Sequence, residues 1–136
     1  MKNKKQNFLD FTVDVKAAVP VYEQVKRAIK FAILSDHLKE GDKLMSLREL
    51  SMKLQINPNT IIKVYSQLEN DGYIYSRPGA GYFVKLDKEK VKTGKYRLLD
   101  EETFEYVSKV SELGFSMADI IAAIKKRMTT ATHKES

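Results

Sequence analysis

Residues 57–72 read NPNTIIKVYSQLENDG and decide the fold of this chain. Asn57 is a preferred residue at the N-cap of a helix. Pro58 suits the first helical position, where no amide hydrogen bond is lost. An Asp-Gly pair ends the pattern. We therefore expect a helix from Pro58 to about residue 70.

This helix has two chemically different sides. Apolar residues at helical spacing form the core side: Ile61, Val64 or Tyr65, and Leu68. The opposite side is polar and rich in amides: Asn59, Lys63, Ser66, Gln67 and Asn70. A helix with such a side is expected to contact a partner.

Three elements are expected before this helix. A partial alternation over residues 8–15 predicts a short strand or extended arm. Apolar residues at a 3.6-residue period predict a helix from Val21 to near Asp36, with Pro20 fitted to its first turn. Ser46, with Glu49 three residues later, forms a capping box and predicts a short helix over residues 47–54.

A small hairpin is expected after residue 72. Residues 73–77 and 82–86 are predicted strands, and residues 78–81 (PGAG) form the turn between them. Three helices followed by a hairpin describe a mainly α fold with a small β wing, the winged helix-turn-helix, whose second motif helix enters the DNA major groove. We expect residues 1–86 to form this DNA-binding domain, including an N-terminal arm.

Two more helices are expected in the last third of the chain. Residues 87–97 form a basic linker, and residues 98–136 a helical tail, with one helix from about Asp100 to near Gly114 and a second capped by Ser116. Each helix has a one-sided apolar stripe. The two stripes are Phe104, Val107, Val110 and Leu113, then Ile120, Ile121, Ile124 and Met128. Two short helices cannot bury both stripes against themselves, so the tail is expected to form a homodimer.

Composition narrows the class of protein. The chain has 136 residues, 43% hydrophobic and 31% charged, which suits a folded domain with an appendage. It has no run of the ~20 apolar residues that a membrane span needs, and its Lys-rich start lacks the apolar core of a signal peptide, so we expect a cytoplasmic protein without membrane contact. No cysteine is present, and two histidines without partner spacing predict neither a metal site, a cofactor nor an enzyme.

The net charge of +6 is unevenly distributed. Residues 85–97 hold cations at Lys85, Lys88, Lys90, Lys92, Lys95 and Arg97 against anions at Asp87 and Glu89. Residues 98–136 are mildly acidic. A basic front part with an acidic tail indicates a polyanion partner for the front part only.

Several motifs in order resemble the GntR family of bacterial regulators, and within it the YtrA-like subfamily with short helical tails. They are Pro20-Val21-Tyr22-Glu23-Gln24, Gly41-Asp42-Lys43-Leu44, Leu47-Arg48-Glu49-Leu50, Asn57-Pro58-Asn59-Thr60, Gly72-Tyr73-Ile74 and Gly81-Tyr82-Phe83-Val84. The sequence departs from the family pattern at Asp36 (usually Gly), Met45 (usually Pro), Ala80 (often a cation) and Tyr82 (usually Thr).

The resemblance implies a homodimer on a two-fold double-stranded DNA operator, repressing a small operon. With the dipole of the helix start and the approach that wing glycines allow, it gives a set of expected DNA contacts. They are Arg48, Asn57, Asn59, Thr60, Lys63, Arg77, Gly79 and Gly81. A small-molecule effector at the dimer interface stays open, and the sequence does not identify one.

Other interpretations stay open at this point. Arg48 could pair with Glu49 or Asp42 on the surface, and Arg77 could serve the hairpin alone. The alternative for the whole chain is a winged-helix module that docks proteins without binding DNA. Six helical cations are left out of the site as solvated or dipole-complementing charges: Lys26, Arg27, Lys30, Lys125, Lys126 and Arg127.

Overall fold

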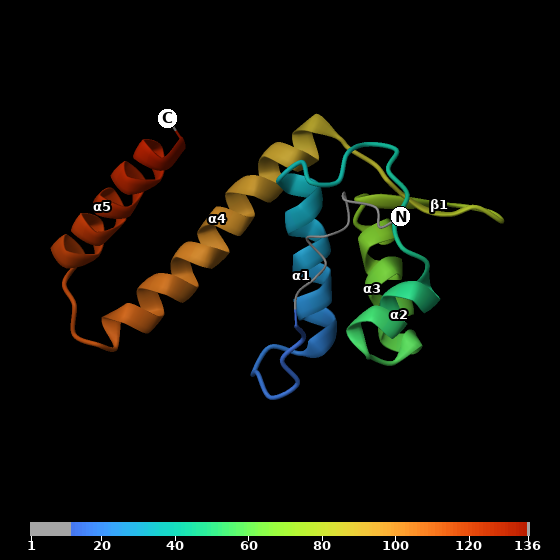
Figure 1. The fold of residues 1–136 in the computed structure, drawn as a ribbon, viewed down its shortest axis with the longest axis horizontal. Helices are drawn as coiled ribbons and strands as arrows, with labels where there is room; N and C mark the ends of the chain where they lie inside the picture. The colour runs from blue at the N-terminus through green and yellow to red at the C-terminus, as the bar shows by residue number, and fades with distance from the viewer. Residues whose placement is uncertain (1–11, 136) are drawn as a thin grey trace. The chain divides into compact units, whose positions relative to one another are not determined.

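The computed structural model describes residues 12–135, with side chains to residue 130. Its elements, labelled in Figure 1 where there is room, are α1 (Val21–Leu34), α2 (Leu47–Leu54), α3 (Pro58–Asn70), β1 (Ile74–Arg77), β2 (Gly81–Val84), α4 (Lys88–Ser111) and α5 (Met117–Glu135). The chain divides into two compact units, residues 1–95 and 96–136, called here the N-terminal unit and the C-terminal unit. The division falls within α4.

The N-terminal unit has a core of its own. α3 packs against α1 and α2, and β1 packs against α3. The predicted apolar stripes are buried, including Val25 and Ile29 of α1 and Ile61 and Leu68 of α3. Tyr65 is also fully buried, and its hydroxyl donates a hydrogen bond to the carbonyl of Met45 at 2.7 Å. Burial raises the pKa of Tyr65, so its phenol remains a neutral donor.

The ends of α2 and α3 follow the predicted capping chemistry. The Glu49 amide donates to Ser46 Oγ at 3.1 Å and the Ser46 amide to Glu49 Oε1 at 3.3 Å, which confirms the capping box. Asn57 Oδ1 accepts from the Asn59 amide at 2.8 Å, ahead of Pro58 in the first turn of α3. α2 ends on Gln55 in the left-handed conformation, with φ of 55°.

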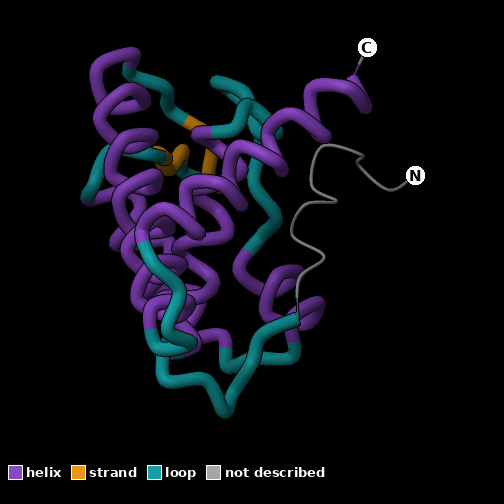
Figure 2. Tube along the Cα trace, turned by 90° about the vertical axis from the view of Figure 1, so that its left-hand side faces the viewer, coloured by secondary structure: helices purple, strands orange, loops and turns teal. Residues whose placement is uncertain are grey.

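The wing is a hairpin with one additional paired segment. β1 and β2 are antiparallel, from the pair Ile74 and Val84 to the pair Arg77 and Gly81, and are the orange segments of Figure 2. The turn has Gly79 at φ 74° after a proline, as in a type II turn. Residues 42–44 pair along β2, because the Leu44 amide donates to the Tyr82 carbonyl at 2.9 Å. The strands are shorter than the predicted residues 73–77 and 82–86.

The prediction that α4 begins near Asp100 is wrong. The helix begins at Lys88, so residues 88–97 of the predicted basic linker are helical. Asp87 Oδ1 accepts from the Glu89 amide at 2.9 Å and caps this early start. Gly94 is buried, and a Cβ on it would lie 3.1 Å from Leu34 Cδ1, so this glycine permits close packing on α1.

The C-terminal unit holds the rest of α4 and the predicted second tail helix, α5. A turn with Gly114 at φ 86° joins them. Ser116 caps α5 as predicted, since its Oγ accepts from the Asp119 amide at 3.2 Å. Asp119 Oδ2 accepts from the Ser116 amide at 3.0 Å and from its hydroxyl at 2.9 Å. The backbone hydrogen bond, then the hydroxyl one, hold the pKa of Asp119 below its ordinary value.

The predicted strand or arm over residues 8–15 lies mostly outside the described residues. Its described part, residues 12–15, has no strand: residues 12–14 are irregular and Val15 begins a turn. The Asp14 amide instead donates to Gln24 Oε1 of α1 at 2.9 Å, which ties this segment to the helix rather than to a sheet.

Candidate nucleic-acid interface

The outer side of α3 is the centre of the candidate site. Asn59, Lys63, Ser66 and Asn70 are exposed there, opposite the buried stripe, as their spacing predicts. The prediction for Gln67 is wrong in part. Its side chain is half-buried, and its Oε1 is buried without a hydrogen-bond partner among the described residues. Helical spacing places Gln67 beside the core edge of Val64 and Leu68.

The first turn of α3 separates residues that hold the helix from residues that can reach a partner. The Asn57 side chain is engaged as the cap, and the Thr60 amide donates to the Asn57 carbonyl at 2.9 Å. Thr60 itself is half-buried, whereas the Asn59 side chain is exposed. The positive end of the helix dipole lies here and favours a phosphate.

Lys63 has a partner that the sequence did not reveal. Its Nζ lies 4.0 Å from the centre of the Tyr22 ring on α1, within cation–π range. This contact draws the ammonium group toward the α1 side of α3. Tyr22 and Lys63 are far apart in the sequence, and no local pattern links them.

Arg48 lies on α2, the helix before α3, and its side chain is exposed. Glu49, one of its two expected ion-pair partners, is occupied in the capping box with Ser46. Within residues 12–130 Arg48 makes no ion pair, so its guanidinium is available to an outside anion.

The wing presents cations on an aromatic surface. The Arg77 guanidinium carbon lies 5.3 Å from the Phe83 ring centre, and Phe83 stacks on Tyr75 at 5.7 Å. Gly79 and Gly81 are exposed, with φ of 74° and 111°. These two values fall in the region that favours glycine.

Lys43 is a wing residue that the sequence analysis missed as a candidate contact. Its Cε lies 3.3 Å from the position of a Cβ on Gly81, so the lysine runs along the wing beside this glycine. The backbone pairing of residues 42–44 with β2 brings it there. The Gly41-Asp42-Lys43-Leu44 motif was the one feature of the sequence that could have drawn attention to this segment.

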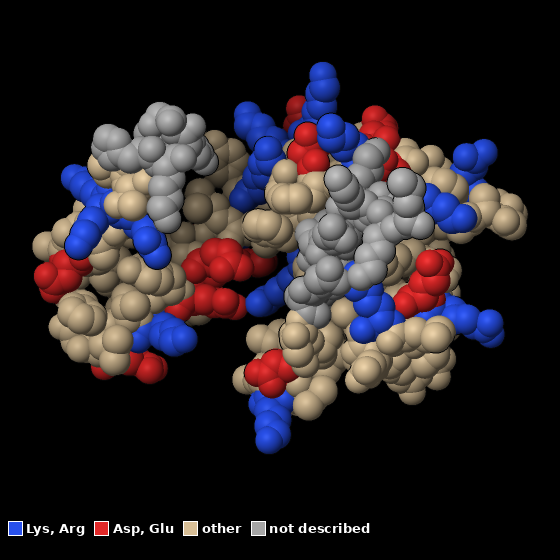
Figure 3. All heavy atoms as spheres, viewed as in Figure 1, with Lys and Arg blue, Asp and Glu red and all other residues tan. Residues whose placement is uncertain are grey.

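Lys26 and Lys30, α1 cations left out of the site, have contacts inside the N-terminal unit. Lys26 Nζ lies 3.4 Å from Asp71 Oδ2, and Lys30 Nζ lies 5.1 Å from the centre of the Tyr73 ring. The face drawn in Figure 3 has Lys and Arg (blue) interspersed with Asp and Glu (red) rather than gathered in one patch.

The residues predicted to form a dimer lie in the C-terminal unit, and most are exposed in the single chain. The exposed fraction is 73% for Phe104, 71% for Leu113 and 64% for Met128, whereas Ile120 is buried. Val107, Ile121 and Ile124 are also exposed, and Val110 is half-buried.

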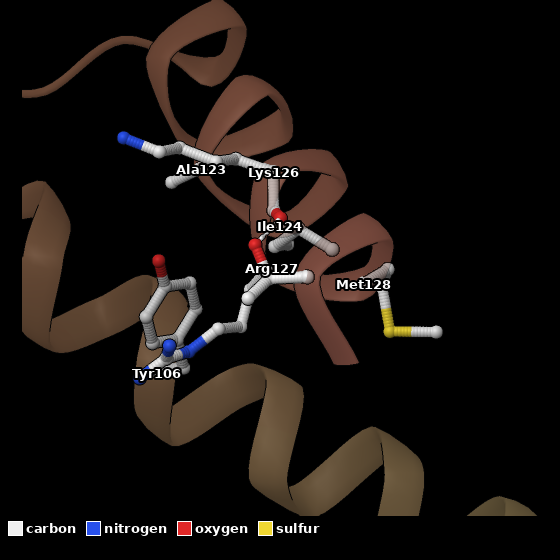
Figure 4. A pocket seen from close by; sticks show the side chains of 7 residues that line it. Tyr106, Ala123, Ile124, Lys126, Arg127 and Met128 are labelled. Carbon is white, nitrogen blue, oxygen red and sulfur yellow. Dashed lines mark hydrogen bonds between the residues drawn. The ribbon is translucent and has the colours of Figure 1, made fainter. Parts of the chain in front are cut away.

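A groove with a volume of about 590 Å³ lies between the two helices of this unit. Figure 4 shows Tyr106 of α4 directed toward the α5 side chains that line it. These include the apolar Ile124 and Met128 and the cations Lys126 and Arg127.

The described part of the chain lacks two other kinds of site. None of its helices is both long and apolar enough to cross a membrane. Residues 12–130 also contain no cluster of three or more His, Asp or Glu side chains that could hold a metal ion.

The fold and the exposed side of α3 define a winged helix-turn-helix, a class of DNA-binding domain. Residues 21–84 match the model of the bacterial regulatory proteins of the gntR family. The chain belongs to the GntR family of DNA-binding transcription regulators, which are not enzymes.

Full-length relatives support the family and the YtrA-like tail. The HTH-type transcriptional repressor YtrA of Bacillus subtilis is 30% identical in sequence to this chain, over 84% of this chain and 88% of the YtrA sequence. A solved GntR family transcriptional regulator from Listeria monocytogenes is 34% identical, with a TM-score of 0.69, over 82% of this chain and 97% of that one. The AraR DNA-binding domain, solved in complex with operator ORE1, is 28% identical, with a TM-score of 0.50, over 56% and 95% of the two chains.

Proposed function

We propose that this protein is a homodimeric repressor that binds a two-fold DNA operator in the bacterial cytoplasm. Each copy would insert α3 into the major groove and lay its wing on the adjacent sugar-phosphate backbone. The observation that carries the proposal is the outer side of α3, where Asn59, Lys63 and Ser66 are exposed opposite a fully buried stripe. Hydrogen-bonding side chains at this position are those that read base edges.

Each side chain of the site has a separate proposed role. Asn59 lies at the start of α3 and has the geometry to pair with an adenine edge. Arg48 of α2 binds a phosphate or a guanine edge. Arg77, whose guanidinium group lies over the Phe83 ring, contacts the DNA backbone together with Lys43. Asn57 acts through the helix that it caps.

Residues 98–136 are the proposed dimerisation tail. Phe104, Leu113 and Met128 are each more than three-fifths exposed, and a second copy of the tail is the partner proposed to cover them. The groove beside Tyr106 adds a concave apolar surface for the same partner. When two N-terminal units are joined, binding of the second unit to the operator becomes intramolecular. The affinity for the whole operator then rises although neither unit makes additional contacts with the DNA.

Repression is proposed by occupation of the operator, which would exclude RNA polymerase. The support for this step is the similarity to YtrA, a transcriptional repressor, over most of both chains. The operator complex of the similar AraR domain supports duplex DNA as the partner.

The test is binding of the full chain to fragments of its source genome at several salt concentrations. We expect preferred fragments, and a loss of affinity of ~10³ or more between about 50 and 200 mM salt if about six phosphates are contacted. Asn59→Ala should weaken binding to preferred fragments by about 1–3 kcal/mol, and Lys63→Ala should also weaken binding. Lys39→Ala, at an exposed position in the loop after α1, is the matched control and should bind normally.

Two results would contradict parts of the proposal. Binding without a preferred fragment and without a salt slope would favour the protein-docking alternative. Sedimentation tests the tail separately: Phe104→Asp places a charge at an exposed position and should give a folded monomer. A Phe104→Asp variant that stays dimeric would place the interface elsewhere.

A further inference from the structure

Ile62 is an apolar side chain on the polar side of α3. It is 46% exposed, whereas its neighbour Ile61 is fully buried. Asn59 precedes Ile62 by three residues and Ser66 follows it by four, and residues at these spacings lie beside each other on a helix surface. Ile62 belongs neither to the predicted core stripe nor to the predicted DNA contacts.

The core of the N-terminal unit does not account for this isoleucine. The stripe of α3 is completed by four other residues, all of them fully buried. A single exposed apolar residue is ordinary on a protein surface. This one, however, lies in the first two turns of the helix proposed to enter the groove, where base edges are contacted.

The contact of Lys63 with Tyr22 determines which part of the exposed side of α3 can face the bases. Lys63 Nζ is held over the Tyr22 ring at 4.0 Å, toward α1. On a helical projection Ile62 and Lys63 lie at opposite edges of the exposed side, with Asn59 and Ser66 between them. The edge away from the ammonium group therefore presents a branched hydrocarbon next to hydrogen-bonding groups.

Thymine is the base whose major-groove edge carries an apolar group, the C5 methyl. We infer that Ile62 is a specificity-determining residue that packs on the methyl group of a thymine in each half-site, beside the base read by Asn59. The inference rests on the proposed function, because it requires α3 to lie in the major groove. It adds a preference for thymine that hydrogen bonds alone would not give.

The experiment uses the full chain and a duplex that it selects from a random library. Each thymine of that duplex is replaced in turn, in both half-sites, by deoxyuridine, which keeps every hydrogen-bonding group and lacks the methyl. We expect one symmetric position at which deoxyuridine lowers affinity about four-fold per half-site, the value of one buried methyl group. Ile62→Ala should abolish this difference, and Ile62→Val should retain most of it.

Phe31→Ala is the matched control, because Phe31 is an exposed apolar residue on α1 at 57% exposure. It should leave the response to deoxyuridine unchanged. An Ile62→Ala variant that still distinguishes thymine from deoxyuridine would overturn the inference, as would a selected duplex with no sensitive thymine. Selection of no duplex at all would overturn the proposed function as well.

Discussion

The two units of the chain differ in how completely they bury their own apolar residues. The N-terminal unit has a core of thirteen buried residues drawn from three helices, both strands and the loop before α2. In the C-terminal unit Ile120 is the one hydrophobic residue among positions 96–130 that is buried. The first unit therefore buries its apolar stripes within a single chain, whereas the second leaves most of its apolar side chains exposed.

The difference follows from the number of elements in each unit. Three helices and a hairpin enclose a volume, so a one-sided stripe on each helix meets a stripe on another. Two helices joined by one turn have only each other, and the outer parts of both stripes stay in water. These exposed parts are the surface that the proposed dimer would cover.

The largest expected difference between the units is in the loss of stability when one leucine of each unit is replaced by alanine. Leu68→Ala removes a fully buried side chain and should destabilise the N-terminal unit by about 2–5 kcal/mol. Leu113→Ala removes a side chain that is 71% exposed and should change the stability of a single chain by less than about 0.5 kcal/mol. Denaturant unfolding of dilute protein measures both variants.

The same two variants, studied at high protein concentration, test the role of the tail in dimerisation. Leu113→Ala should then weaken dimerisation in sedimentation experiments, while Leu68→Ala should leave the association constant of the folded fraction unchanged. Equal losses of stability for the two variants in dilute protein would show that the C-terminal unit has a complete core of its own.

The next largest effect is expected from a truncation that removes most of the C-terminal unit. A chain that ends at Arg97 keeps the capped start of α4 and the packing of Gly94 on Leu34. We expect it to be folded and monomeric, and to lose ~10² or more in affinity for a full operator. Its affinity for a half-site should equal that of the intact chain. A truncated chain that stays dimeric would contradict the comparison.

The smallest effect concerns the cap of α5. The pKa of Asp119 is lowered by its hydrogen bonds from Ser116, so the folded state binds a proton less readily than the unfolded chain. This contribution to stability is present above the ordinary carboxyl pKa of 3.8 and is lost as pH falls through that value to the lower folded pKa. Asp119→Asn should lack it. Thermal unfolding of both chains at neutral and acid pH measures the difference.

The predictable parts of the structure depend on residues close together in the sequence. The bounds of α2 and α3 were correct because Ser46, Glu49, Asn57 and Pro58 determine their own helix starts by local hydrogen bonds and sterics. The wing followed from its glycines and proline for a similar reason. Most of the exposed side of α3 was also predictable, since the buried stripe determines which residues face outward.

The errors involve contacts between distant segments. The start of α4 was placed too late because the basic residues 87–97 were interpreted as a linker. The packing of Gly94 on Leu34, which a side chain at residue 94 would obstruct, shows that this segment is a packed helix. Gln67 was assigned to the surface although it lies at the core edge. The Tyr22 contact of Lys63 and the position of Lys43 beside Gly81 depend on the tertiary fold, which no local pattern encodes.

The left-handed residue at the end of α2 has a consequence for engineering. Gln55 has φ of 55°, and Asp36, in the loop after α1, has φ of 65°. A side chain in this conformation is disfavoured by roughly 1–2 kcal/mol relative to glycine, less for aspartate. The N-terminal unit therefore carries backbone strain at two exposed positions. Glycine at either position offers a route to a more heat-resistant regulator with its reading surface unaltered.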